Sequence, residues 1–362
     1  MSGGLPVVPV YDLAVKGDEL VVATHGRSFW ILDDLNPLRE LTRNSADSPG
    51  VRLFPPRSRV RARRQEIDVT DARPGYVNYA NADTSPVLWD TVTGHDGQPA
   101  VRLLTAGTNP PAGMVVTWHL PHSPVTDATL SFQDPAGTEC RQFSLGGPGV
   151  PVVPGVSRFT WNLRSPGATS LEDVPLDSWE RPDGPLIVPG DYEVRLTVDG
   201  ETVSRPFTLL PDPRNTSPIA DLVALREMLL EILASLSRTN ETIIRVESLR
   251  AQASAWLAWA SDPAVTAAAQ AVIDATEPLR PQLIDIGMHE AQLWPSGLHE
   301  KFNALFESVD SADFAPPTQA RDVLAKLTTE LNEIVGTVEE IGQEEVGQLN
   351  ALLRQGATAY VG

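Results

Sequence analysis

Two adjacent acidic residues, Asp33 and Asp34, are of a type that could do hydrolytic chemistry. Hydrolysis of a glycosidic bond uses two carboxylates that flank the bond, one as an acid and the other as a base or nucleophile. Neighbouring residues of a strand point to opposite faces, so this pair does not form such an acid and base. Because aspartate side chains often hydrogen-bond the backbone of a turn, we expect Asp33 and Asp34 to end a strand and cap a turn.

Six histidines could act as metal ligands or proton carriers: His25, His95, His119, His122, His289 and His299. His119 and His122 lie three residues apart, but Pro121 between them excludes a helix. A zinc site would also need a third protein ligand and hydrogen bonds that orient the ligands. The spacing therefore favours structural or solvent-exposed histidines, and no metal site is predicted.

The single cysteine, Cys140, excludes an internal disulfide and a multi-cysteine metal site. A lone cysteine in a strand is typical of inert packing. The sequence contains no nucleotide-binding fingerprint and no Gly-x-Ser-x-Gly motif of serine hydrolases. We therefore predict no catalytic residues, no cofactor-binding residues, no metal ligands and no cofactor.

One basic cluster, residues 57–64 (RSRVRARR), has two interpretations. Short charge runs are usually solvated, which favours an exposed connector that balances local acidity. The alternative is a strip that docks an anionic ligand or a partner. Further along, Tyr76, Tyr79 and Trp89 could stack on sugar rings, although aromatic side chains more often cover the edge of a core.

Composition restricts the classes of partner. The net charge of −19 argues against a nucleic acid or an anionic membrane as the main partner. A hydrophobic content of 41% is that of a globular protein. No run of about 18 apolar residues is present, so no membrane span is expected. The N-terminal residues lack the pattern of a signal peptide, and the compartment stays unknown.

The elements that would position these residues begin with a β-rich half. Three short strands joined by tight turns are predicted over residues 7–15, 20–24 and 28–32 and indicate an antiparallel meander. Such a meander buries little and leaves two open edges, so it is expected to belong to a larger closed array such as a β-propeller. We predict a blade remnant over 1–56 and a connector over 57–107, with strands over 86–92 and 100–104.

Residues 108–213 predict a sandwich of the immunoglobulin-like kind, because short strands alternate with turn signals. Asp199-Gly200 is a strong hairpin signal, since a type I′ turn needs positive φ at both central residues. Trp161 is expected in the core, and a long acidic loop over 165–183 interrupts the sandwich. The predicted strands cover 115–120, 128–133, 139–145, 158–163, 186–188, 192–198 and 202–209.

Residues 216–362 predict a helical bundle. Ser217 is expected to cap the first helix, with Pro218 at its first position. Further helices are predicted over 264–276, around 298–306 and from 316 onwards, with an extension of the last one over 346–353. Two stripes at near-heptad spacing should pack on each other, or alternatively serve as an external docking face. The stripes are Leu222, Leu225, Leu229, Ile232, Leu236, Ile243 and Val246, and Leu324, Leu327, Leu331, Ile334, Val338 and Ile341.

Several segments, in this order, resemble one large bacterial family. The segments are DELVVATHGRSFWILDDLNPLREL (18–41), LFPPR (53–57), TNPPAG (108–113), SRFTWNLR (157–164), GPLIVPGDYEVRLTVDG (184–200) and LWPSGLHEKFNALFESVDSADFAPPTQA (293–320). They are similar to the last blade, sandwich and helical tail of sortilin-type propeller proteins with neuraminidase-like repeats, often labelled glycosyl hydrolases. The resemblance implies a chain with about one blade where the family has many, and it implies export.

These observations predict a multidomain β plus α protein that acts as a non-catalytic structural or interaction module of a propeller-containing protein. Expected partners are proteins: the propeller portion missing from this chain, a second chain or another copy. Carbohydrate is a further candidate ligand. One alternative is a glycosyl-hydrolase-like protein whose catalytic propeller is mostly missing. Another is an adaptor that binds a partner by strand addition at the blade edge.

Overall fold

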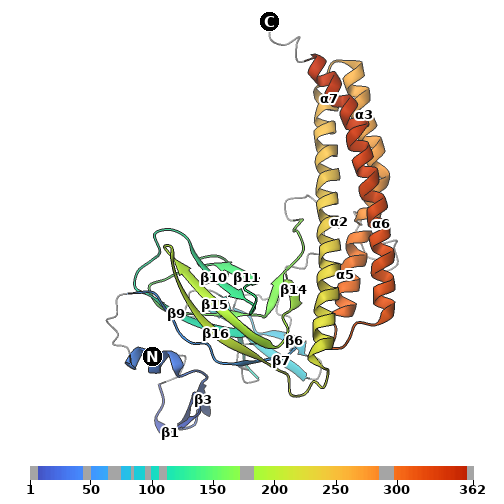
Figure 1. Cartoon of the computed structure of the whole chain (residues 1–362). Helices are drawn as coiled ribbons and strands as arrows, with labels where there is room; N and C mark the ends of the chain where they lie inside the picture. The colour runs from blue at the N-terminus through green and yellow to red at the C-terminus, as the bar shows by residue number, and fades with distance from the viewer. Residues whose placement is uncertain are drawn as a thin grey trace. The chain divides into compact units, whose positions relative to one another are not determined.

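The computed structural model describes residues 7–43, 50–63, 75–82, 85–93, 99–105, 112–171, 183–284 and 297–356. It contains β-sheets and α-helices, as predicted (Figure 1). The chain divides into two compact units. The β unit comprises Met1–Leu163 and Pro189–Arg214, and the helical unit comprises Arg164–Val188 and Asn215–Gly362.

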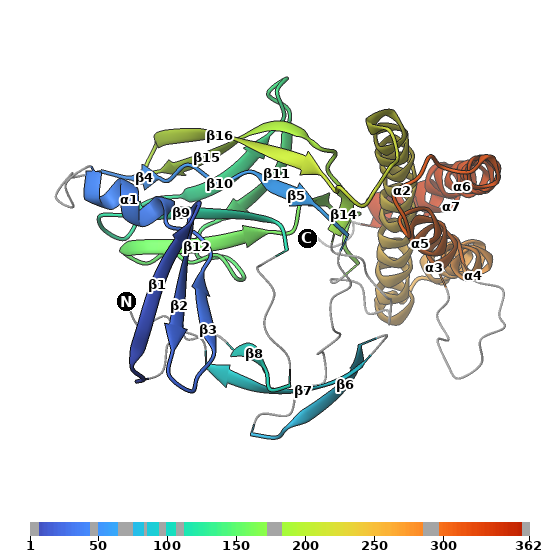
Figure 2. The same cartoon turned by 90° about the horizontal axis from the view of Figure 1, so that it is seen from below.

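The β unit begins with the predicted antiparallel meander. Its strands lie in the order β1-β2-β3 and are β1 (Val10–Lys16), β2 (Glu19–Thr24) and β3 (Phe29–Leu32) (Figure 2). Gly17, at φ 61°, allows the first tight turn, since positive φ carries no steric cost for glycine. The helix α1 (Asn36–Arg43), which was not predicted, follows the meander.

Two further sheets form the body of the β unit. One has the order β11-β10-β15-β16-β5, and the other has the order β12-β9-β4. In the first, β5 runs parallel to β16, so the sheet is mixed. Their strands are β4 (Arg52–Leu53), β5 (Arg59–Arg61), β9 (Met114–Leu120), β10 (Ala128–Gln133), β11 (Glu139–Ser144), β12 (Gly155–Trp161), β15 (Gly190–Val198) and β16 (Glu201–Pro211).

The core of the β unit joins these two sheets. Trp161 of β12 stacks on Phe132 of β10, with ring centroids 4.2 Å apart, and both side chains are fully buried. The core position predicted for Trp161 is therefore confirmed. The predicted hairpin is also confirmed, because β15 pairs with β16 and Asp199 and Gly200 have φ of 50° and 84°. The strand predicted over 158–163 instead covers Gly155–Trp161.

A separate three-stranded sheet lies in the region predicted as a connector. It has the order β6-β7-β8, with β6 (Asn78–Ala82), β7 (Ser85–Thr93) and β8 (Pro99–Leu103). The strands predicted over 86–92 and 100–104 are thus confirmed within one residue at each end.

The helical unit contains a long helix, α2 (Ile219–Trp259), and shorter helices beside it (Figure 1). The residues of both predicted stripes belong to one buried hydrophobic cluster, except Leu222, which is buried outside that cluster. The stripes therefore pack together rather than form an external face. The other elements are α3 (Pro263–Thr276), η1 (Glu277–Leu279), α4 (Arg280–Leu283), α5 (Leu298–Val309), α6 (Thr318–Gln343) and α7 (Glu345–Gly356).

The start of α2 differs from the sequence prediction. Ser217 does not cap the helix; its hydroxyl donates to the carbonyl oxygen of Asp313 at 2.7 Å. Pro218 takes the cap position, without a side-chain hydrogen bond, and the first helical residue is Ile219. The Ser217 hydroxyl therefore makes a tertiary hydrogen bond instead of capping the helix.

A segment predicted inside the sandwich belongs to the helical unit. Strands β13 (Arg164–Pro166) and β14 (Asp183–Leu186) pair only with each other, so the sandwich strand predicted over 186–188 is wrong. Leu171 is buried in the helical core, and the backbone carbonyl of Thr169 accepts a hydrogen bond from Asn240 at 2.7 Å. The rest of the predicted acidic loop, 172–182, lies outside the described residues.

Candidate functional site

The adjacent carboxylates lie where the sequence predicts, between β3 and α1. Asp34 Oδ1 accepts a hydrogen bond from the backbone N–H of Asn36 at 3.0 Å, which is the expected turn-capping role. The backbone carbonyl of Asp33 accepts a hydrogen bond from Arg57. These contacts give both residues a local structural role.

The described histidines do not converge. His25 lies against the Tyr11 ring, with centroids 5.0 Å apart, His119 lies in β9, and His299 is buried in the helical unit. His122 Nδ1 lies 3.0 Å from the carbonyl oxygen of Ser123. Within the described ranges, no three His, Cys, Asp or Glu side chains are grouped so as to hold a metal ion. His95 and His289 lie outside those ranges.

The basic cluster is built into the β unit. Arg57 lies 3.6 Å from Asp18 and 3.7 Å from Glu19, at the β1–β2 turn. Arg59 begins β5, where burial and the neighbouring cations Arg57 and Arg158 hold the pKa of its guanidinium below its usual range. The cluster therefore connects the meander to the mixed sheet, as the structural interpretation predicts. Its arginines are not exposed as expected, because Arg57 and Arg59 are half-buried and Arg61 is buried. Arg64 lies outside the described residues.

The three aromatics of the connector are split between interior and surface. Trp89 is buried, while Tyr76 and Tyr79 are exposed. Trp89 therefore has no open ring face for a sugar, which agrees with its interpretation as part of a core. Cys140 is buried and forms no disulfide, and its thiol donates to the carbonyl oxygen of Thr138 at 3.8 Å, which agrees with its interpretation as a packing residue.

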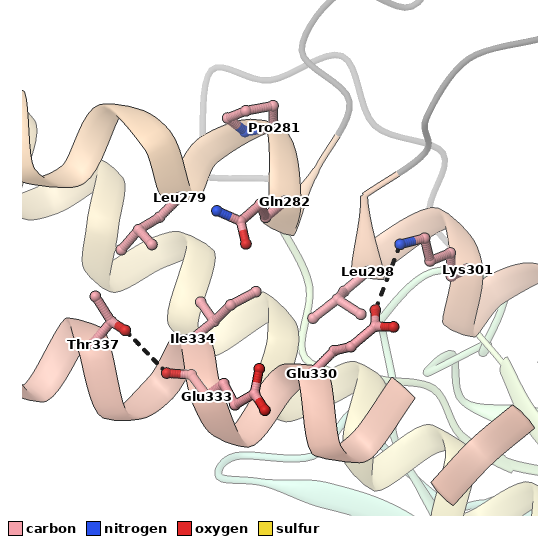
Figure 3. A pocket seen from close by; sticks show the side chains of 9 residues that line it. All are labelled: Leu279, Pro281, Gln282, Leu298, Lys301, Glu330, Glu333, Ile334 and Thr337. Atoms are coloured by element: carbon pink, nitrogen blue, oxygen red, sulfur yellow. Dashed lines mark hydrogen bonds and ion pairs between the residues drawn. The ribbon is translucent and has the colours of Figure 1, made fainter. Parts of the chain in front are cut away.

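The helical unit contains a groove of about 440 Å³ between α4, α5 and α6 (Figure 3). Its lining mixes apolar side chains such as Ile334 with polar ones. Lys301 Nζ lies 3.6 Å from Glu330, so these two charges neutralise each other across one side of the groove. Thr337 donates to the backbone carbonyl of Glu333 at 3.1 Å. The two carboxylates of this groove, Glu330 and Glu333, lie on one helix, and we assign it no chemistry.

The most unusual surface is the sheet β1–β3, which we call the open sheet. Residues directly opposite each other in neighbouring antiparallel strands lie on the same face. The register places Leu13 opposite Val22 and Val22 opposite Trp30. The first face therefore consists of Leu13, Val15, Leu20, Val22, Trp30 and Leu32.

The second face of the open sheet is also largely apolar. Ala14 lies opposite Val21, and Val21 lies opposite Ile31. This face carries Ala14, Val21, Ala23, Phe29 and Ile31, with Asp12 at one rim and the charged pair Lys16 and Glu19 beside the β1–β2 turn. An antiparallel sheet with one solvated face normally alternates apolar and polar residues, so apolar residues on both faces indicate a sheet made to be covered on both sides.

Neither face is fully covered by the described part of the chain, although every residue of β2 is half-buried. No residue of β1, β2 or β3 is buried. The exposed fractions are 59% for Leu13 on the first face and 71% for Phe29 and 57% for Ile31 on the second. Exposed apolar surfaces of this kind mark sites of interaction, because soluble proteins rarely leave them open to water.

Among the described residues, the polar contacts between the open sheet and the following segments gather at one end of the sheet. Asp18, in the β1–β2 turn, pairs with Arg39 of α1 and with Arg57, and its backbone carbonyl accepts from the N–H of Leu35 at 2.8 Å. These contacts surround the turn rather than the faces. The sheet is therefore anchored through its charged end, and its apolar faces stay accessible.

Sequence reasoning predicted the meander but not the two accessible faces. A signal was present: Leu20 to Ala23 is a continuous apolar run, which is typical of strands buried on both faces. Sequence cannot show whether the chain itself provides the cover.

No family model and no curated protein matches this chain. Of the helices in the described ranges, none combines the length and the apolar character needed to cross a bilayer.

Proposed function

We propose that the chain is a non-catalytic structural or interaction module of a propeller-containing protein, in which propeller sheets cover the open sheet. The observation that carries this proposal is the pair of apolar, exposed faces on β1–β3. Facing sheets pack about 10 Å apart with interdigitated side chains. A propeller blade lies between two neighbours, so both of its faces are buried.

The remainder of the β unit supports an immunoglobulin-like sandwich as the neighbour of that blade. Two sheets share a core in which Trp161 and Phe132 stack, and the strands of each pair are antiparallel except at β5. The parallel β5 pairing departs from the immunoglobulin pattern of antiparallel sheets. We therefore propose a related sandwich with an added edge strand.

Strand addition is a second candidate, favoured by the position of β1. This strand is at one edge of the open sheet, and all seven of its residues are exposed. An exposed edge can pair with an extended partner through backbone hydrogen bonds. The two candidates differ in the surface used, because strand addition needs the edge and blade stacking needs both faces.

Site-specific photo-crosslinking from the full chain in its native host tests the proposal. A benzoylphenylalanine would replace Leu13 on the first face or Ile31 on the second, and exposed Val125 would serve as the control position. We expect crosslinks from both faces, but not from the control, to strand segments of propeller-type sequence. Crosslinks from β1 positions alone would favour strand addition.

Two outcomes would overturn the proposal. The first is the absence of crosslinks from both faces under conditions in which the protein is abundant. The second is turnover of a glycoside by the purified chain that a single substitution abolishes, which would identify an enzyme. The turnover assay is independent of the crosslinking experiment. A lack of crosslinks and an enzymatic activity can therefore be told apart.

A further inference from the structure

A second surface lies at the end of the helical unit where α2 meets α3 (Figure 1). Residues 251–273 contain a single charged residue, Asp262, in a chain with net charge −19. The Asp262 carboxylate accepts a hydrogen bond from the N–H of Ala264 at 2.8 Å and so caps α3. The segment that joins α2 to α3 is therefore nearly free of charge, while α7, which packs on α3, carries Glu345 and Arg354.

Three large apolar side chains are exposed there: Trp256, Leu257 and Trp259, which we call the Trp tip. The exposed fraction is 41% for Trp256 and 86% for Trp259. The two tryptophans are three residues apart on a helix, so they lie on the same side. The N–H of Ala260 donates to the carbonyl of Trp256 at 2.9 Å, so the last turn stays helical and holds both rings on a regular element.

The Trp tip does not serve the hydrophobic core. The cluster beneath it is made mainly of small residues, with Ala253, Ala268 and Ala269 buried between helices. Val265, Val272 and Leu349 complete that cluster, and the tryptophans are not among its buried members. The core beneath the tip is complete without the two indole rings. Their exposure therefore indicates a site of interaction with another molecule.

We propose that the Trp tip inserts into the interface of an uncharged, zwitterionic lipid bilayer. Tryptophan concentrates at membrane interfaces because its ring is apolar and its N–H is polar. A stable protein interface needs about 800 Å² on each partner, which two rings and one leucine at the end of a hairpin do not supply. Insertion needs only a few apolar side chains and no charges that must lose their water.

Electrostatics selects the type of bilayer. An anionic surface repels a chain of charge −19, and the tip offers no basic cluster to offset the repulsion. A neutral phosphatidylcholine surface carries no such penalty. The proposal concerns peripheral binding to a membrane surface and does not require a membrane-spanning helix. It is also independent of the role proposed for the open sheet.

Co-sedimentation of the full chain with phosphatidylcholine vesicles tests the proposal. We expect binding that 1 M salt does not weaken, and a partition coefficient lowered about tenfold or more by Trp256→Ala with Trp259→Ala. Phe314→Ala removes an exposed aromatic elsewhere in the same unit and should leave binding unchanged. Thermal unfolding of each variant would establish that it is folded.

Three results would overturn the proposal. One is the absence of binding to phosphatidylcholine vesicles by the unmodified chain. Another is binding that appears only with phosphatidylglycerol vesicles, which would point to an electrostatic mechanism. The third is self-association in sedimentation velocity that depends on the tryptophans and occurs without vesicle binding, which would make the tip a contact between copies of the chain.

Discussion

Nδ1 of His299 lies 2.8 Å from Oδ1 of Asn240, in the interior of the helical unit. The amide group of Asn240 donates to the carbonyl oxygen of Thr169, so its oxygen faces the imidazole and accepts from Nδ1–H. One side chain thus joins α2 to α5 and to the segment that follows β13. Its partner His299 is buried, at 2% exposure, whereas Thr169 is half-buried.

Asn240→Leu is therefore expected to destabilise the helical unit. The substitution leaves the buried Nδ1–H of His299 without this partner, at a cost of about 1–3 kcal/mol, and also removes the hydrogen bond to the half-buried Thr169. Urea denaturation followed by circular dichroism measures the change. Glu231→Gln, at an exposed position of α2, is the matched control. Equal unfolding free energies for N240L and the control would contradict the assigned role.

Leu171→Ala tests whether the segment between β13 and β14 completes the helical core. Leu171 is buried in the same cluster as Leu229, Phe302 and Phe306. Removing a buried leucine side chain costs about 2–5 kcal/mol, because transfer energy and packing are both lost. The readout is the unfolding of the helices by far-ultraviolet circular dichroism. A change below about 0.5 kcal/mol, the range of surface substitutions, would show that the segment is not part of this core.

Gly113→Ala should destabilise the β unit through both backbone and contact. Gly113 has φ of 122°, and a Cβ at this position would overlap the carbonyl oxygen of Trp161. Holding a residue with a side chain in such a conformation costs on the order of 1–3 kcal/mol. Gly137→Ala is the control, since Gly137 has φ of 83° with open space around its Cβ position. The difference in melting temperature between the two variants isolates the clash with Trp161.

Asp212 should titrate at unusually low pH. Hydrogen bonds from the Arg214 side chain, and then from its backbone, lower the pKa of this carboxyl from 3.8 to about 2. A lowered pKa in the folded state contributes stability above pH 3.8 that is lost as the pH falls through about 2. Carbon-detected NMR titration would measure the pKa directly. In Arg214→Gln it should return towards 3.8, and an unchanged value would refute this cause.

The sequence predicted the elements well wherever local pattern and burial agree. The α2 stripe from Leu225 to Val246 and the Asp199-Gly200 turn follow from spacing and backbone conformation alone. Pairings between distant segments could not be predicted in this way. The parallel contact of β5 with β16 joins residues about 150 positions apart, and no local signal marks it. Ser217 shows the same limit. Its hydroxyl donates to the distant backbone carbonyl of Asp313 and does not cap the helix that follows it.

The candidate site was predictable in part. The apolar run Leu20 to Ala23 indicates a strand covered on both sides, but only the structure shows Phe29 and Ile31 exposed to water. The low charge around the Trp tip is visible in the sequence, since residues 251–273 contain one charged residue. Its exposure depends on how the alanines of α2 and α3 pack, which sequence spacing does not determine.

The backbone passes from one unit to the other three times, after Leu163, Val188 and Arg214. Neither unit is therefore a contiguous stretch of the gene. Recombination at a single point cannot transfer the helical unit alone. A crossover after Arg214 leaves Leu171 behind, and one after Leu163 carries β15 and β16 of the β unit along. On the ribosome, Leu171 emerges well before the helices that bury it, so it stays uncovered until α5 has been synthesised. The two units are inherited, and must mature, as one piece.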